Sequence, residues 1–421
     1  MGGIEKLKLM LVMAFMCMAI LVCYVESVNE TKYLPADTSA EHRENMLRVR
    51  MHLYCQDRPY KARKILRTNY WVLENYVMAE HGAIPCFSSI TYTTHADYRY
   101  LDNLIPLLER WRAPISLAVY APGTDFVSTL NSIRWLLQCA PQRDLVRAFV
   151  SFHIYFNALH MPSAVPKSEH VLKRKVDCKD EAPFADPELP MTYRKQHFLN
   201  YPVNVGRNIA RDAAVTHFVL ASDIELYPTP HLVERFMDML GRNPKMMKNN
   251  SPHVYVLRVF EVEQNVTVPD TKKELKYLLR KGLAISFHSR LCPECHEGPR
   301  LKAWIAAKSS DVLNIFHVGQ RIGSAIRWEP IFIGTQMDPV YEERLSWEGM
   351  SDKMTQAYAL CALGYKFLIL DNAFLTHKPG IKTTVGDIER VFLAARTYYM
   401  ISRKMVNELR IMYGNRWGCT I

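Results

Sequence analysis

The chain of 421 residues lacks three features: a Gly/Ser-rich tract, a block of like charges and an internal repeat. The first two absences exclude long disordered segments, and the third excludes a repeat architecture. The formal net charge is +11, but the lysines and arginines are scattered along the chain. Because nucleic-acid-binding proteins gather basic residues in patches, we expect no nucleic-acid partner.

An uncharged N-terminal run sets the expected topology. Lys6 and Lys8 precede residues 9–25, which carry no charged side chain. This length is at the short edge of a membrane span, and cleavage after Ser27 as a signal peptide is an alternative. The run is long for a signal peptide, so we favour an uncleaved anchor with the lysines in the cytoplasm. The expected parts are a cytoplasmic tail (1–8), a transmembrane signal-anchor (9–25), a stem (26–50) and a lumenal domain (51–421).

The cysteines also fit a lumenal location. Two of the ten lie in the uncharged run, and the other eight are an even number in an oxidising compartment, where we expect disulfides of unassigned connectivity. Glycosylation sequons begin at Asn29, Asn249 and Asn265. The eight cysteines are Cys55, Cys86, Cys139, Cys178, Cys292, Cys295, Cys361 and Cys419.

From residue 84 onward, β-rich stretches alternate with stretches of helical periodicity. This alternation predicts an α/β fold with a mostly parallel sheet flanked by helices. The expected strands are 87–93, 115–120, 146–156, 218–221, 254–263, 328–334 and 365–370. The expected helices are 97–111, 125–139, 204–214, 231–240 and 351–363. We expect residues 162–190 to be a surface excursion and residues 270–310 to be irregular.

The strongest candidate site follows the strand at 218–221. This apolar run ends abruptly in Ser222-Asp223-Ile224-Glu225, and ligands of α/β sheets bind at the carboxyl ends of strands. Two carboxylates at such a strand end suit Mg²⁺ or Mn²⁺ carrying a diphosphate. His377, after the last expected strand, is the best candidate for a further ligand, and Lys378 adds positive charge beside it.

Two further groups of residues are candidates for binding and for proton transfer. Arg207 and Asn208, on the helix before the metal strand, are suited to a nucleotide or its phosphates. An acidic group near the carboxyl end of the fold offers a general base. Its members are Glu329, Glu342, Glu343, Glu348 and Asp352.

The sequence Cys292-Pro293-Glu294-Cys295-His296 formally matches a haem attachment site, and with His288 it resembles a zinc cluster. Neither interpretation has supporting context, because there is no second CxxC pair. We therefore expect a loop closed by a disulfide.

These motifs, in this order and spacing, resemble glycosyltransferase family 49 over roughly residues 85–385. The matching segments are Thr93-Thr94-His95-Ala96, Leu107-Leu108-Glu109-Arg110-Trp111, Asn204 with Arg207-Asn208, Ser222 to Pro228, Trp328-Glu329-Pro330, Glu343-Arg344 and Phe374 to Lys378. The resemblance implies a GT-A fold with a Rossmann-like mixed sheet flanked by helices, a UDP-sugar donor, a Mn²⁺ ion and a type II protein of the Golgi membrane. Asp223, Glu225 and His377 match the family's metal positions.

The resemblance also implies a reaction. Length and single-domain plan are most similar to the β-1,4-glucuronyltransferase type, which moves glucuronic acid from UDP-glucuronate to a xylose-terminated O-glycan on a glycoprotein. In GT-A enzymes the base often lies at the start of the helix after the acceptor-side strand, so we expect Glu348 first, Asp352 second and Glu329 next. Asp352 is equally suited to stabilise the helix start.

Two departures from the family pattern leave alternatives open. The second metal carboxylate, usually Asp, is Glu225, and the usual Gly-aromatic-Asn is Gly349-Met350-Ser351. A transferase using another UDP-sugar, such as UDP-N-acetylglucosamine, is the enzymatic alternative. A catalytically silent lumenal protein that binds glycan is the alternative from another class.

Overall fold

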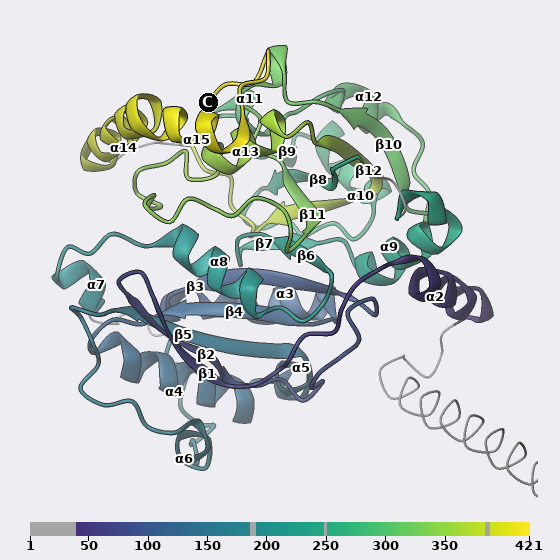
Figure 1. The fold of residues 1–421 in the computed structure, drawn as a ribbon. Helices are drawn as coiled ribbons and strands as arrows, with labels where there is room; N and C mark the ends of the chain where they lie inside the picture. The colour runs from purple at the N-terminus through teal and green to yellow at the C-terminus, as the bar shows by residue number, and fades with distance from the viewer. Residues whose placement is uncertain (1–38, 186–190, 248–250, 384–387) are drawn as a thin grey trace, which may run out of the picture.

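The computed structural model describes residues 39–185, 191–247, 251–383 and 388–421 (Figure 1). The expected tail and anchor, the first part of the stem and the sequons at Asn29 and Asn249 lie outside these residues. Within the described ranges, no helix is both long and apolar enough to cross a membrane.

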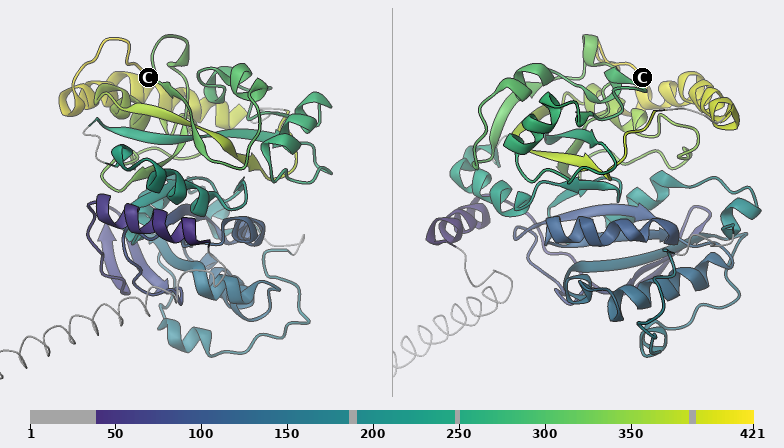
Figure 2. Two further views of the ribbon diagram at one scale, coloured as in Figure 1. Left: turned by 90° about the vertical axis from the view of Figure 1, so that its right-hand side faces the viewer. Right: turned by 180° about the vertical axis from the view of Figure 1, so that it is seen from behind.

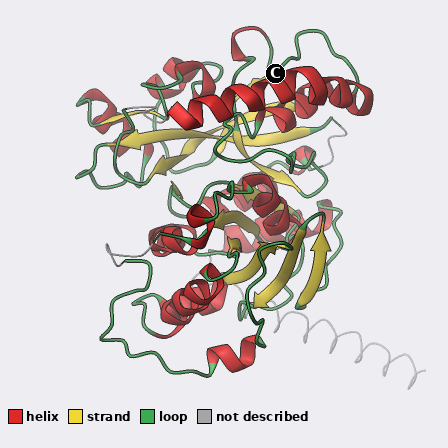
Figure 3. Cartoon of the chain, turned by 90° about the vertical axis from the view of Figure 1, so that its left-hand side faces the viewer, coloured by secondary structure: helices red, strands yellow, loops and turns green. Residues whose placement is uncertain are grey.

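The described strands form one twelve-stranded sheet with the order β1-β2-β5-β4-β3-β6-β11-β8-β12-β10, and β7 pairs with β12 while β9 pairs with β8. The strands are β1 (Arg63–Arg67), β2 (Tyr70–Val77), β3 (Ile90–Ala96), β4 (Ile115–Tyr120), β5 (Val150–Asn157), β6 (Phe218–Ala221), β7 (Leu226–Pro228), β8 (His253–Val262), β9 (Ala284–Ser286), β10 (Asn314–Gly319), β11 (Ile331–Thr335) and β12 (Lys366–His377). In Figures 1 and 3 the strands of the C-terminal half lie above those of the N-terminal half.

The sheet is mixed, as expected for a GT-A fold, whereas the alternation of strands and helices taken alone predicted a mostly parallel one. β5, β4, β3 and β6 run parallel, as predicted, and so do β8 and β12. The other neighbours are antiparallel, including β6 with β11 and β11 with β8. Two consecutive strands can run parallel only if a crossover connection, usually a helix, joins them. Some of the described segments between the later strands contain no such helix.

The chain reverses its direction of winding at β3. From β3 it crosses to β4 on one side, and β6 pairs with β3 on the other side, with Thr93 opposite Ala221. The carboxyl ends of β3 and β6 therefore lie next to each other. In α/β sheets a crevice for ligands opens at such a switch point.

Helices pack against both halves of the sheet (Figure 2). The α-helices are α2 (Ala40–His52), α3 (Leu104–Trp111), α4 (Asp125–Gln138), α5 (Arg143–Phe149), α6 (Ser168–Leu172), α7 (Tyr193–Gln196), α8 (Val203–Ala213), α9 (Leu232–Arg242), α10 (Lys272–Arg280), α11 (Pro293–His296), α12 (Leu301–Ala306), α13 (Met354–Ala362), α14 (Ile388–Met400) and α15 (Val406–Tyr413). Short 3₁₀ helices are η1 (Tyr98–Asn103), η2 (Pro244–Met246) and η3 (Gly323–Ala325), and η4 (Ile401–Met405) is a π-helix.

Helix α2 occupies residues that the sequence placed in the stem. It packs against α9, with Val49 buried (Figure 1). His42 Nδ1 and Asn45 Nδ2 each lie 3.0 Å from Asp238 Oδ1 on α9. The stem assignment therefore needs correction at its end, because residues 40–50 fold onto the domain. The helix was not predicted because most of its residues are polar and few are buried.

Strand β12 is longer than predicted. It continues past residue 370 to His377, with an irregularity between Ile369 and Phe374 in its pairing with β8. Asn372 has φ of 60° in this stretch, and Asn tolerates that conformation better than most residues. His377 is thus the last residue of the strand rather than part of the loop after it. Likewise, α10, β9, α11 and α12 replace the irregular segment expected at 270–310.

All eight cysteines in the described part of the chain form disulfides, which confirms the expected pairing. The bonds are Cys55–Cys86, Cys139–Cys178, Cys292–Cys295 and Cys361–Cys419. The loop at Cys292 is therefore closed by a disulfide as expected, and its sulfur atoms are not available as thiolate ligands.

Candidate functional site at the β3/β6 switch point

The turn after β6 is fixed to the end of β3. The Ser222 backbone N–H donates to the Thr93 carbonyl over 3.1 Å. The buried Tyr92 hydroxyl donates to the carbonyl oxygens of Asp223 and Leu226, at 3.0 and 2.7 Å. These bonds hold the acidic turn at the switch point, so the sequence placed Asp223 and Glu225 correctly at a strand end.

Asp223 is surrounded by basic side chains. Arg207 Nη2 lies 2.8 Å from Asp223 Oδ1, His95 Nε2 lies 3.3 Å from the same atom, and Lys353 Nζ lies 3.7 Å from Oδ2. Burial alone would raise the pKa of the Asp223 carboxyl, but Lys353 and Arg207 outweigh it and hold that pKa well below its usual range. Burial lowers the pKa of His95, so its imidazole is neutral near pH 7. Asp223 is therefore a permanent carboxylate.

Arg207 connects Asp223 to a second carboxylate. Its side chain is 1% exposed, and Nη1 binds both Asp352 and the Asn204 side-chain oxygen. Burial of Asp352 is outweighed by Lys353 and Arg207, which lower the pKa of its carboxyl. Arg207 thus satisfies two buried carboxylates, and the three groups form a rigid ionic network.

A polar stripe on α8 holds the segment that carries Asp352. Asn204, Arg207, Asn208 and Arg211, at i, i+3, i+4 and i+7, are all buried. The Asn204 side chain donates to the carbonyls of Glu342 and Asp352, each at 2.8 Å. The spacing of this stripe is visible in the sequence, but from it we expected only that Arg207 and Asn208 bind a nucleotide or its phosphates.

A glycine brings this helix close to the sheet. A Cβ at Gly206 would lie 2.6 Å from the Tyr155 hydroxyl and 3.0 Å from His95 Cβ. Any larger residue would push α8 away from β3. The glycine therefore sets the distance between Arg207 and the carboxyl end of the sheet.

Glu225 and His377 form a pair suited to a cation. β12 and β7 pair Leu226 with His377, which brings His377 Nε2 to 3.3 Å from Glu225 Oε2. His377 Nδ1 lies 2.7 Å from the Lys378 carbonyl oxygen, which can only accept a hydrogen bond. Nδ1 therefore carries a proton, and a neutral ring would offer Nε2 as an electron-pair donor beside the Glu225 carboxylate. Two electron-pair donors facing each other, with the ring held through its other nitrogen, are typical of a metal site.

The third predicted metal ligand is not part of this pair. Within the described residues, no three His, Cys, Asp or Glu side chains converge closely enough to hold a metal ion. Asp223 faces Arg207, His95 and Lys353 instead. The donor set of Glu225 and His377 fits a divalent cation, while Asp223 as a ligand stays a prediction.

The two other predicted binding residues have local partners. Lys378 Nζ lies 2.5 Å from Asp102 Oδ2, and both side chains are more than a third exposed. Asn208 donates to the Tyr341 carbonyl and to Glu343 Oε1, each at 2.8 Å, and accepts from the Tyr341 N–H at 3.0 Å. The structure therefore places Asn208 in the support of the segment at 341–343, not beside Asp223.

The three predicted base candidates differ in their environments. Glu348 is held by Arg194 Nη1 at 2.8 Å and by the Tyr201 backbone N–H at 2.9 Å. Asp352 is held by Arg207. In the described part of the chain, the Glu329 carboxyl has no hydrogen-bond partner. Burial raises its pKa against the opposing effects of Lys353 and Arg207.

Two residues of the site had no role in the sequence-based prediction. His95 belongs to a motif of the resemblance, but nothing in its spacing connected it to Asp223. Lys353 lies 130 positions after Asp223 in the sequence and belongs to no recognisable motif. Both are brought to the site by tertiary packing, which a single sequence does not display.

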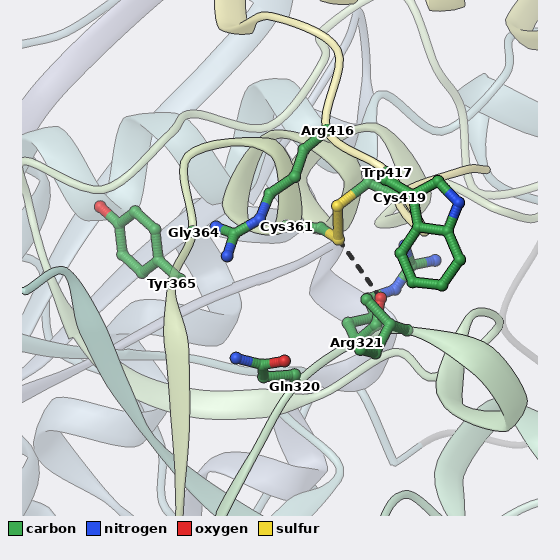
Figure 4. Close-up of a pocket in the computed structure, with 9 residues that line it drawn as sticks. Gln320, Arg321, Cys361, Gly364, Tyr365, Arg416, Trp417 and Cys419 are labelled. Atoms are coloured by element: carbon green, nitrogen blue, oxygen red, sulfur yellow. Dashed lines mark hydrogen bonds between the residues drawn. A yellow bond between two sulfur atoms is a disulfide. The ribbon is translucent and has the colours of Figure 1, made fainter.

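The two best-defined cavities lie outside this centre. One, of about 260 Å³, is lined by Arg321, Cys361, Arg416, Trp417 and Cys419 among others, and contains no carboxylate (Figure 4). The other, of about 340 Å³, is lined by Arg67, Asn208, Glu343 and Tyr413 among others. Neither contains the acidic turn.

Comparison with known proteins agrees with this arrangement. Residues 89–414 match the family model described as "Glycosyl-transferase for dystroglycan". The chain is 31% identical over 305 residues to beta-1,4-glucuronyltransferase 1 of Danio rerio, covering 70% of this chain and 68% of that protein. It is 25% identical over 336 residues to the Mus musculus protein of the same name, covering 78% and 77%. It is also 25% identical over 329 residues to xylosyl- and glucuronyltransferase LARGE2 of Rattus norvegicus, covering 78% of this chain and 39% of that protein.

The family match and the relatives together identify this chain as a glycosyltransferase. The chain belongs to the glycosyltransferase family named above, which confirms the resemblance found in the sequence.

Proposed function

We propose that this protein is a GT-A enzyme that transfers glucuronic acid from UDP-glucuronate to a xylose-terminated O-glycan. The observation that carries the proposal is the acidic turn Asp223-Ile224-Glu225 at the switch point, with His377 against Glu225, in a chain of this family. The donor is supported by the names of the relatives, which are glucuronyltransferases.

Glu225 and His377 would hold the divalent cation, for which we propose Mn²⁺. When bound, such an ion neutralises the charge that develops on the diphosphate leaving group. Arg207 and Lys353 lie around Asp223 and balance the negative charge of the acidic turn. We propose Asp223 as a third metal ligand and Lys378 as a contact to the phosphates. When the donor binds, each side chain would have to exchange its present ion-pair partner for the ion or the phosphate.

The acceptor hydroxyl must lose a proton as its oxygen attacks the anomeric carbon. A base in this role needs a free lone pair and a pKa near the working pH. Glu348 and Asp352 are each neutralised by an arginine, whereas Glu329 has a raised pKa and no hydrogen-bond partner among the described residues. We therefore place Glu329, the third candidate from the sequence, ahead of Glu348 and Asp352.

The proposed location is the Golgi lumen, with residues 9–25 as a type II anchor. The N-terminal sequence of the cellular protein tests this point, because a mature N-terminus at Val28 would contradict an anchor. The activity is tested with purified residues 39–421 and a panel of UDP-sugars on a xylose-terminated acceptor with MnCl₂. Transfer of N-acetylglucosamine instead would support the enzymatic alternative. Binding of glycan without turnover of any donor would support the silent lumenal protein.

A further inference from the structure

Lys353 is a partly buried cation of the site whose bonding within the described residues is incomplete. Arg207 binds Asn204, Asp223 and Asp352, and Lys378 binds Asp102. Arg194 binds Glu348 and the Leu199 carbonyl. By contrast, the Lys353 ammonium makes no hydrogen bond within the described residues, and its one carboxylate contact there is Asp223 Oδ2 at 3.7 Å.

Lys353 is both charged and reachable. A lysine ammonium is charged at neutral pH, and the Asp223 carboxylate faces it. Its side chain is 18% exposed, so the surrounding residues do not enclose it completely. An ammonium with three donors, partly withdrawn from water and without a hydrogen-bond acceptor, gains free energy when an anion approaches.

The backbone around Lys353 fixes its position. Met350 and Ser351 both adopt left-handed φ values, 55° and 52°, and the Asn204 side chain holds the Asp352 carbonyl at 2.8 Å. Lys353 then precedes the first turn of α13. Strained residues of this kind persist where the surrounding structure aims a functional group.

We propose that Lys353 binds the carboxylate of the transferred sugar and so selects a uronic acid donor. This inference rests on the proposed function. The proposed cation on Glu225 and His377 would serve the diphosphate. Lys353 instead lies beside Asp223, the other carboxylate of the acidic turn. Burial lowers the pKa of His288 to about 4 and that of His296 to about 3, so these neighbours add no positive charge at neutral pH.

UDP-glucose provides the matched comparison, because it differs from UDP-glucuronate only in having a neutral hydroxymethyl group in place of the carboxylate. Binding of both donors to residues 39–421 is measured by calorimetry with MnCl₂, together with kcat/KM for transfer. Lys353→Met should weaken UDP-glucuronate by about 10- to 100-fold, the worth of a charged hydrogen bond, mainly through Kd and KM. UDP-glucose binding should stay within about twofold, and Lys353→Arg should retain part of the selectivity.

The failures are distinguishable. If the unmodified protein binds UDP-glucuronate no more tightly than UDP-glucose, the proposed donor is wrong and this inference falls with it. If the unmodified protein prefers UDP-glucuronate and Lys353→Met keeps that preference, Lys353 has no part in donor selection. Equal weakening of both donors would assign Lys353 to the diphosphate and overturn the proposal. Lys302→Met, an exposed position on α12, should change neither donor.

Discussion

His377 Nε2 lies 3.3 Å from Glu225 Oε2, although 151 residues separate the two in the chain. Strand pairing produces this contact, because His377 is opposite Leu226 in the β7–β12 ladder. With the His377 ring neutral, Nε2 and the Glu225 carboxylate would together offer two electron-pair donors to a divalent cation.

Removing His377 should therefore remove metal-dependent turnover. His377→Ala should lower kcat/KM by about 10²- to 10³-fold at a fixed MnCl₂ concentration, the loss expected for several kcal/mol of charge stabilisation. The half-saturating Mn²⁺ concentration should rise in the same variant. His317→Ala on β10, outside the site, is the control. Full activity of the unmodified protein in excess EDTA would contradict the whole metal assignment.

The carboxylate length at position 225 gives a second prediction. Asp is the usual residue here in the family, and Glu225→Asp should keep transferase activity, because a shorter carboxylate still ligates the same ion. Asp223→Asn should abolish turnover without unfolding the domain, although it also leaves Arg207 and Lys353 short of a partner. Circular dichroism and a MnCl₂ titration of both variants separate loss of metal from loss of fold. An inactive, folded Glu225→Asp variant would show that the longer side chain is required.

The Arg207–Asp352 pair should contribute to stability in a pH-dependent way. The folded-state pKa of Asp352 lies below its ordinary value of 3.8, so the contribution is complete above that pH and is lost as the pH falls through the folded pKa. Asp352→Asn should cost about 3 kcal/mol at pH 7, because it leaves the buried Arg207 with only one of its two carboxylate partners. The difference in urea unfolding free energy should shrink below pH 3.8.

A surface pair supplies the control for that measurement. Asp212 is 49% exposed and binds Arg67 at 2.5 Å. Asp212→Asn should cost less than about 1 kcal/mol, since exposed ion pairs contribute little. Similar losses in the two variants would show that the Arg207–Asp352 network is not a special stabilising feature.

Local sequence patterns predicted the elements that carry the site, but not the contacts between them. The apolar run at 218–221 and its acidic end identified β6 and its turn, because both depend on neighbouring residues. The extent of β12 depends on Asn372 and an irregular ladder with β8, and the position of Lys353 depends on bonds from α8. Such long-range features leave no periodic pattern. The polar stripe at Asn204 and Arg211 is the exception, because its spacing was visible.

The strained turn before Lys353 gives a prediction about stability. Ser351 has φ of 52°, which costs a residue with a Cβ roughly 1–2 kcal/mol, and the family's usual Asn tolerates this region better. Ser351→Gly should raise the unfolding free energy by about 1 kcal/mol, and Ser351→Asn by less. Ser351→Ala, which keeps the Cβ, should bring no gain. A loss of stability in the Gly variant would show that the turn is not strained by its side chain.

The last prediction concerns proton transfer by Glu329. Burial raises the pKa of its carboxyl above the ordinary 4.5, so the base becomes protonated and activity falls at a higher pH than for an exposed carboxylate. The acidic limb of the kcat/KM profile should therefore lie above pH 4.5. Glu329→Gln should lower kcat by about 10²- to 10⁴-fold and remove that limb, with donor Kd little changed. Glu348→Gln breaks the contact with Arg194 instead and should lower kcat while keeping the limb. If the limb disappears with Glu348→Gln and persists with Glu329→Gln, the order expected from the sequence is the right one.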